Sequence, residues 1–165
     1  MNCYVICVYW GARSESQERC SQRMDVFLNS LGKLRGQFQN WFPKTAQKSG
    51  STKPISGVED VFKMLKSNRK DIGNAVISDL GFSFSAWNRE SQGLTASISS
   101  TCGCSNKYVS NSVVLTFEFN EEVSIDNLRK IFSSAINLFE AESGIVKLRK
   151  SNSDDLVIEE FKAHK

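Results

Sequence analysis

The stretch SVVLTFEF, residues 112–119, carries the clearest strand pattern in the chain. Side chains of a β-strand alternate between its two faces, and every second residue from Val113 to Phe119 is apolar. The pattern therefore predicts a strand that turns one face toward a hydrophobic core. Glu118 lies on the opposite face and is expected to point away from that core.

Other strand patterns lie on both sides of this one along the chain. Residues 3–10 form a continuous apolar run, which predicts a central first strand covered on both faces. Residues 80–87 and 94–100 alternate apolar and small polar side chains, so we expect two antiparallel strands joined through residues 88–93. Two short strands are expected at 145–148 and 156–158.

Three helices are expected between these strands. Ser14 and Gln17 fit a capping box before an amphipathic pattern over residues 15–34. Ser56 and Glu59 fit a second box before a short helix that ends near residues 67–70. Ser124 is expected to cap a third helix, which Gly144 ends.

This order of elements predicts an α+β fold in which helices pack on one face of an antiparallel sheet. The 165 residues correspond to one domain, 1–165, within which residues 144–165 are a less certain C-terminal extension. The chain is 40% hydrophobic and 24% charged and has two prolines, which favours a globular protein over a disordered one.

Composition also indicates the cellular compartment. No apolar run reaches the roughly 18 to 20 residues that a membrane-spanning helix needs. The run at residues 4–10 is too short for the apolar core of a signal peptide and has no basic region before it. The five cysteines are an odd number and are expected to be reduced thiols. We therefore expect a cytoplasmic protein with no membrane partner.

The charges are distributed unevenly along the chain. Residues 1–70 hold 12 Lys and Arg against 5 Asp and Glu, a balance of +7. Residues 71–165 hold 9 against 13, a balance of −4, which gives the net charge of +3. Two surfaces of opposite sign are expected if the fold keeps the halves apart, although solvated faces without a partner would give the same balance.

Catalytic residues do not assemble into a recognisable set. The single histidine, His164, lies next to the C-terminus, so a Ser-His-Asp or Cys-His arrangement has no plausible base. Cys102 and Cys104 lack the further ligands of a zinc site, and the acids at 118–122 fit no metal-binding loop. Phosphate-binding glycine loops are also missing. We therefore expect no enzyme activity, no metal site and no cofactor.

A basic segment with aromatic residues supports one alternative, a small nucleic-acid-binding protein. Such a surface would follow a phosphate backbone and stack on bases. Its members are Lys44, Lys48, Lys53, Lys63, Lys66, Arg69 and Lys70, with Trp41 and Phe42. The modest net charge and the absence of a recognisable binding motif weigh against this alternative.

Three separated groups of motifs point to a known family. The first is YWGARSES at residues 9–16, followed by Glu18, Cys20 and Arg23. The second combines RKDIG at 69–73, DLGF at 79–82 and WN at 87–88. The third combines SSTCG at 99–103 and NSVVL at 111–115. In this order and spacing, over residues 4–140, the chain resembles the immunity protein 52 family of bacterial polymorphic toxin systems.

The resemblance implies a non-enzymatic antidote that binds and inactivates a cognate toxin. The toxin that the resemblance implies has a restriction-endonuclease-like fold and is often one delivered into competitor cells by type VI secretion. The resemblance therefore implies a protein partner rather than direct contact with nucleic acid, and it leaves a homo-oligomer possible. It gives the segment after Gly144 no role.

Two sets of residues are candidates for these roles. Trp10, Gly11, Arg13 and Glu15 are expected to be structural, because a strand end, a tight turn and a helix start need these residue types. A nuclease presents a positive channel to phosphates, so acidic residues and an apolar anchor are expected to contact it. The predicted partner-binding residues are Trp87, Asn88, Glu118, Glu121, Glu122, Asp154 and Asp155.

Overall fold

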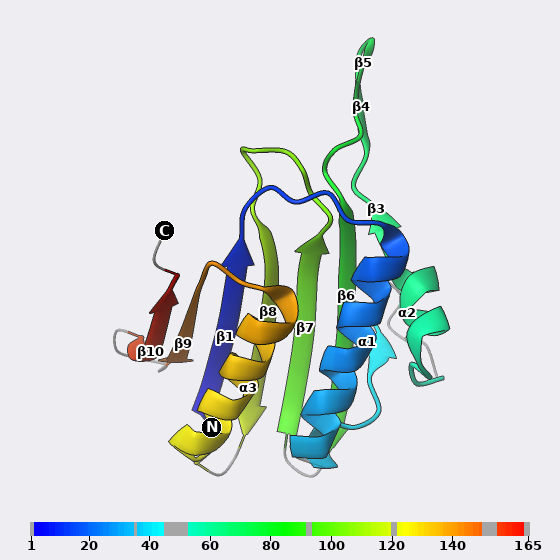
Figure 1. Cartoon of the computed structure of the whole chain (residues 1–165). Helices are drawn as coiled ribbons and strands as arrows, with labels where there is room; N and C mark the ends of the chain where they lie inside the picture. Colours follow the sequence, from blue (N-terminus) through cyan, green and yellow to red (C-terminus); the bar gives the residue numbers. More distant parts are fainter. Residues whose placement is uncertain are drawn as a thin grey trace.

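The computed structural model describes residues 2–34, 36–44, 53–91, 94–119, 122–149 and 155–163. Within these residues, eight strands form one antiparallel sheet in the order β10-β9-β1-β8-β7-β6-β2, with β3 also paired to β6. Helices α1 and α3 cover one face of the sheet (Figure 1). The prediction of an α+β fold with helices on one face of an antiparallel sheet is confirmed.

The main strands are β1 (Asn2–Trp10), β6 (Phe82–Ser91), β7 (Leu94–Cys102), β8 (Asn111–Phe119), β9 (Ser143–Arg149) and β10 (Leu156–Lys162). Two short strands, β2 (Phe42–Pro43) and β3 (Lys66–Ser67), pair with β6 at the edge of the sheet. The predicted hairpin of 80–87 and 94–100 exists, but its first strand is longer than predicted. Strand β6 continues past Trp87 to Ser91, and its pairing with β7 is irregular between Trp87 and Glu90.

The first strand is central, as predicted, because β1 pairs with β8 on one side and β9 on the other. Its even-numbered residues face the helices, and Tyr4, Ile6 and Val8 are almost fully buried. On the other face Val5 and Cys7 are only 8% and 7% exposed, although the helices do not cover that face (Figure 1). Residues 4–8 are therefore buried on both faces of the strand, as predicted, although the long helices lie on one face only.

The helices differ from the predictions mainly at their ends. Helix α1 (Gln17–Leu34) begins after Ser16, whose Oγ accepts a hydrogen bond from the Arg19 amide at 3.3 Å, so the cap is not Ser14. Helix α2 (Val58–Met64) begins after Gly57 with no side-chain cap. The predicted box of Ser56 and Glu59 is replaced by a bond from the Ser56 amide to Asp60.

Helix α3 (Ile125–Phe139) has the predicted cap, because the Ser124 side chain accepts a hydrogen bond from the Asn127 amide. It ends earlier than predicted, at Phe139, and Glu140 follows with a left-handed φ of 50°. Gly144 instead lies in β9, where a Cβ atom would come within 2.8 Å of the Cys7 carbonyl oxygen. The glycine is thus required by close packing against β1 rather than by a helix end.

The hydrophobic core lies between the two long helices and the sheet. The largest fully buried side chains are Phe27, Phe38, Phe117, Phe132, Phe139, Ile6, Met24, Leu31, Ile98, Leu115 and Leu128. Trp41, just after the short 3-10 turn η1 (Gly36–Phe38), is 4% exposed and stacks on Phe38. Among the described residues, no helix is both long enough and apolar enough to cross a membrane.

A separate hairpin of β4 (Lys70–Ile72) and β5 (Ala75–Ile77) projects beyond the body of the protein (Figure 1). The sequence patterns did not predict it. Its two-residue turn begins at Gly73, whose φ of +59° suits the glycine position of a type II′ hairpin turn. Residues 70–76 are all exposed, so the hairpin has no side that packs into the core.

The C-terminal segment is continuous with the main sheet. Strand β9 pairs with the central β1 along its length, and β10 pairs with β9 at the edge. A bulge in β10 falls between Val157 and Glu159. The segment after Gly144 therefore contributes two strands to the sheet.

Candidate partner-binding surfaces

The fold brings several of the predicted acidic residues to one end of the sheet. Glu118 lies opposite Cys3, and Cys3 lies opposite Arg149, so the end of β8, the start of β1 and the end of β9 are adjacent. Asp155 directly precedes β10 at the same end, because Leu156 pairs with Leu148. We call Glu118, Glu122 and Asp155 the acidic rim. Glu121 and Asp154 lie outside the described residues.

The ionisation of Cys3 reflects this grouping. Burial is the main cause that raises the pKa of its thiol, and the negative charges of Glu118 and Asp155 raise it further. Arg149 acts in the opposite direction. Two acids of the rim are thus close enough to influence the same thiol. Glu118, Glu122 and Asp155 are all exposed, so their carboxylates are available to a partner.

Trp87 lies on the face of the sheet that the helices leave open. Its neighbours in β6, Phe84 and Ala86, are 2% and 0% exposed and face the core, whereas Trp87 is half-buried. Across the ladder Trp87 pairs with Ser97, which pairs with Thr116. Because Glu118 follows Thr116 by two residues, Trp87 and Glu118 share this open face, with β7 between their strands.

Asn88 does not share that surface. Its side chain is 2% exposed, and its Oδ1 accepts a hydrogen bond from the Ala96 amide at 2.6 Å. This bond occurs where the pairing of β6 and β7 shifts between Trp87 and Glu90. The structure thus gives Asn88 a role inside the sheet in place of the surface contact expected from the sequence, because the strand continues past Trp87 and encloses the next side chain.

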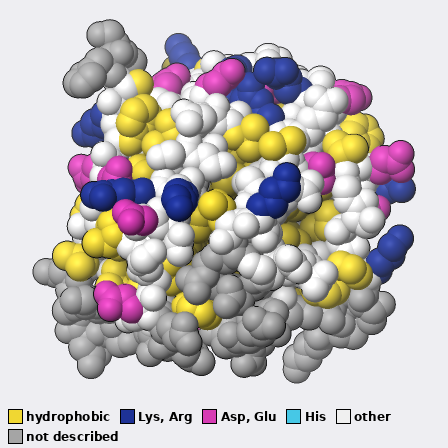
Figure 2. Space-filling view, turned by 60° about the horizontal axis from the view of Figure 1, so that its bottom comes forward, with side chains coloured by type: hydrophobic (Ala, Val, Ile, Leu, Met, Phe, Trp, Pro, Cys, Tyr) yellow, Lys and Arg dark blue, Asp and Glu magenta, His cyan; other side chains and the backbone are white. Residues whose placement is uncertain are grey.

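The charges do not separate into two simple surfaces on the face that Figure 2 draws. There Lys and Arg side chains are interspersed with Asp and Glu side chains and with apolar patches. The halves of the chain are interleaved in the sheet, because β1 from the first half pairs with β8 and β9 from the second. The difference in charge along the sequence is therefore not maintained over that face.

Some of the basic residues do gather at the β6 edge. Lys44, Lys63 and Lys66 line a hollow of about 470 Å³ beside residues 83–85. Arg69 and Lys70 lie at the projecting hairpin instead. Trp41, which a nucleic-acid surface would use for base stacking, is buried in the core. Lys48 lies outside the described residues. The basic hollow therefore still supports nucleic-acid binding, but Trp41 is not available to stack on bases.

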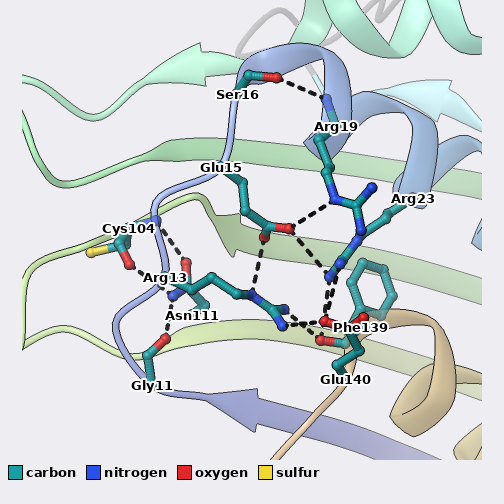
Figure 3. A network of polar contacts seen from close by, with 10 residues as sticks. All are labelled: Gly11, Arg13, Glu15, Ser16, Arg19, Arg23, Cys104, Asn111, Phe139 and Glu140. Atoms are coloured by element: carbon teal, nitrogen blue, oxygen red, sulfur yellow. Dashed lines mark hydrogen bonds and ion pairs between the residues drawn. The ribbon is translucent and has the colours of Figure 1, made fainter.

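The first sequence motif forms a polar network at the opposite end of β1 (Figure 3). Arg13 Nη1 donates to Glu140 Oε2 at 2.7 Å, and its Nη2 donates to the Phe139 carbonyl oxygen at 2.6 Å. Its guanidinium also lies 5.4 Å from the centre of the Trp10 ring. Arg13 thus provides a hydrogen-bond donor for a backbone carbonyl at the C-terminal end of α3. Through its contact with Trp10 it also connects this helix end to the end of β1.

Glu15 occupies the centre of this network. Its carboxylate lies 3.3 Å from Arg23 Nη1, 3.5 Å from Arg13 Nε and 3.7 Å from Arg19 Nε. The Glu15 and Arg23 side chains are only 5% and 10% exposed, so their charges compensate each other in a nearly buried position. Arg23 Nη2 continues the network to Glu140 at 3.2 Å. The arginines, Arg23 first, hold the pKa of Glu140 below its ordinary value.

A second part of the network fixes the turn after β1. Asn111 Nδ2 donates to the carbonyl oxygens of Gly11 and Cys104, and its Oδ1 accepts from the Cys104 amide. The Arg13 amide donates to the same Cys104 carbonyl. Asn111 is fully buried, and the sequence did not predict this role, because the burial of an asparagine cannot be read from the chain alone. The motif residues Trp10, Gly11, Arg13 and Glu15 therefore lie in an intramolecular network.

The described residues contain little that would support a metal site or a reactive thiol. No group of three or more His, Cys, Asp or Glu side chains is placed there to hold a metal ion. All five cysteines are free thiols. Cys102 and Cys104 are buried, and a hydrogen bond to Cys20, followed by burial, raises the pKa of Cys102. The Cys102 thiol is thus a poor nucleophile.

The chain matches a known family over nearly its whole length. A family model described as Immunity protein 52 matches residues 2–162. The match includes β9 and β10, which lie beyond the sequence motifs described above. No curated protein matches the chain.

Proposed function

This chain belongs to the Immunity protein 52 family, and from that membership we propose that it binds and neutralises a nuclease toxin. The family implies an immunity protein and hence a toxin as protein partner. The proposal adds that the toxin is a metal-dependent nuclease of restriction-endonuclease-like fold from a polymorphic toxin system, with delivery by type VI secretion. It also places the antidote in the cytoplasm and gives it no enzyme activity.

The acidic rim supports a mechanism for this inhibition. A nuclease requires a positive channel for phosphates, and carboxylates that face such a channel increase the rate and specificity of association. Glu118, Glu122 and Asp155 present exposed carboxylates at one end of the sheet, and Trp87 lies on the adjoining open face. We propose that the rim faces the toxin channel while Trp87 contributes an apolar contact near the centre.

Nucleic-acid binding is the competing function, and the hollow lined by Lys44, Lys63 and Lys66 is the observation that favours it. Nucleic-acid binding would depend steeply on salt and would require no protein partner. Titration of single-stranded and double-stranded DNA and RNA at several salt concentrations separates the two functions. Binding to nucleic acid in the absence of any toxin would support the competing function.

The direct experiment uses the protein encoded beside this chain. The neighbouring reading frame is expressed with and without the chain, and nuclease activity is measured as the antidote is titrated. We expect a stoichiometric complex in which activity falls to zero at a fixed molar ratio. A neighbouring protein that neither binds this chain nor degrades nucleic acid would contradict the proposal. Metal-dependent turnover by the chain alone, abolished by Glu118→Gln, would also contradict it.

A further inference from the structure

The projecting hairpin, residues 70–77, is held firmly at its base and is uncovered at its tip. The Asn68 amide donates to the Gly81 carbonyl at 2.9 Å, and the Ser105 amide donates to the Asp79 carbonyl at 3.0 Å. These bonds fix the hairpin to the start of β6 and to the loop before β8. At the tip, Ile72 is 62% exposed and Val76 is 54% exposed. We call residues 69–77 the arm.

One face of the arm carries three apolar side chains and one lysine. Lys70 pairs with Ile77 and Ile72 pairs with Ala75, so these four side chains share a face, while Val76 lies on the other. A two-stranded hairpin with no packing partner is only marginally stable in water. Exposed apolar side chains on such an element are typical of a surface that another protein covers.

A hollow of about 360 Å³ lies between α1 and α2, the helix that leads through β3 into the arm. Its lining residues are Glu18, Ser21, Gln22, Val58, Glu59, Phe62 and Lys63. Val58 and Phe62 provide its apolar part, and Val58 is 38% exposed. Gln17 Nε2 donates to the Phe62 carbonyl at 2.9 Å, which fixes α2 against α1. The hollow is therefore a preformed apolar feature with charged residues at its margin.

Arm and hollow are complementary in charge as well as in polarity. Arg69 and Lys70 outweigh Asp71 on the arm, and Arg69 Nε pairs with Asp71 at 3.2 Å, which leaves Lys70 as its excess positive charge. At the hollow, Glu18 and Glu59 outweigh Lys63. An apolar arm with a positive charge thus matches an apolar hollow with a negative margin.

We propose that two copies of this chain associate by exchanging arms, with Ile72 of each copy seated in the α1–α2 hollow of the other. A two-fold interface needs two complementary features on one continuous surface of the same chain. The chain satisfies this need, because α2 leads through β3 directly into the arm and the arm projects past α1 and α2 (Figure 1). This self-association goes beyond the proposed function, because it involves no toxin.

Sedimentation equilibrium of the purified chain over a range of concentrations tests the proposal. The wild type is expected to reach twice the chain mass of 18.5 kDa as concentration increases. Ile72→Asp is expected to remain at the single-chain mass. Ile125→Asp is a matched control, because Ile125 is 53% exposed at the start of α3, and it is expected to dimerise like the wild type. A wild type that stays monomeric, or an Ile72→Asp variant that still dimerises, would overturn the proposal.

Exchanging the charges of one arm residue and one hollow residue tests whether the arm binds in the hollow. Lys70→Glu and Glu59→Lys are each expected to raise the dissociation constant of the dimer by about tenfold or more. The double variant is expected to recover most of that loss, because it restores opposite charges with their positions exchanged. Circular dichroism of all variants checks that the fold is kept. Single variants without effect, or a double variant that dimerises no better than either single one, would overturn the pairing.

Discussion

The indole of Trp10 stacks on the phenyl ring of Phe139, with ring centroids 5.4 Å apart and an interplanar angle of 15°. The stack connects the end of the central strand to the end of α3, and Phe27 of α1 meets Phe139 edge-on at 5.5 Å. Three elements that lie far apart in the sequence thus meet at one buried aromatic cluster. The first family motif, which contains Trp10, therefore contributes to stability.

Replacement of Trp10 tests that contribution. Trp10→Ala is expected to lower the free energy of unfolding by about 3 to 5 kcal/mol, because it leaves a cavity and removes the stack with Phe139. Urea unfolding followed by circular dichroism measures the change. Ile125→Ala, at a half-exposed position, should change stability by about 0.5 kcal/mol or less. Equal stability of Trp10→Ala and the wild type would show that the cluster does not support the fold.

Removal of the central carboxylate tests the polar network. Glu15→Gln removes the nearly buried carboxylate beside Arg23, whose side chain is 10% exposed and which keeps its ion pair with the exposed Glu140, so we expect a loss of about 3 kcal/mol. Arg129→Ala is the control, because its ion pair with Glu159 is exposed and should contribute about 1 kcal/mol or less. Thermal and urea unfolding of both variants give the comparison. If both variants lost equally little free energy of unfolding, the network would not stabilise the fold.

Glu140 makes part of the stability dependent on pH. Arg23, with Arg13 beside it, holds the pKa of this carboxyl below its ordinary value of 4.5. Because the folded pKa is depressed, the stabilising contribution is complete above 4.5 and is lost as pH falls through the folded pKa. We therefore expect wild type and Glu140→Gln to differ in stability at neutral pH and to converge in acid.

Unfolding midpoints measured from neutral to acidic pH check the dependence on Glu140. Glu122→Gln serves as control, since it removes an exposed carboxylate at the other end of the sheet, away from these arginines. A constant difference between wild type and Glu140→Gln at all pH values would mean that the carboxylate charge is not the cause of the effect.

The elements that form the core could be predicted from the sequence, because burial imposes a period on the residues. Residues 112–119 alternate because one face packs on helices, and that strand is found as expected, with Asn111 as one further residue at its start. The arm carries no such period, since residues 70–76 pack on nothing, and only its Gly73-Asn74 turn marked it. Helix ends were less predictable, because Ser14 and Ser16 are equally good caps and only the path of the chain selects Ser16.

The polar network and the partner-binding residues were predictable only in part, because their neighbours are brought together by the fold and not by the sequence. Arg13 was expected to be structural, but its partners Glu140 and the Phe139 carbonyl come from the end of α3 and meet it only in the folded chain. Asn88 was expected in a turn because Gly93 follows closely, yet the ladder continues past it. Glu118 was placed correctly, since alternation alone determines its face.

The remaining prediction concerns the acidic rim and the toxin. Glu118→Lys, Glu122→Lys and Asp155→Lys, combined in one variant, should reduce the association rate by about tenfold or more at low salt, because each reversal replaces attraction to a positive channel with repulsion. The corresponding reversals Lys44→Glu and Lys53→Glu should have little effect, because both lysines line hollows beside Pro43, which pairs with β6 at the edge of the sheet. Stopped-flow or surface-binding measurements against salt concentration provide the rates.

The form of the salt dependence distinguishes the two possible geometries of inhibition. If the rim covers the channel, the wild-type rate falls steeply as salt rises and the rates of wild type and rim variant converge at high salt, because screening removes the steering. Trp87→Ala should then act mainly on dissociation, since an apolar contact contributes after encounter. If the rim variant associates and protects like the wild type, the toxin is held by another surface, and the inhibitor acts away from the channel.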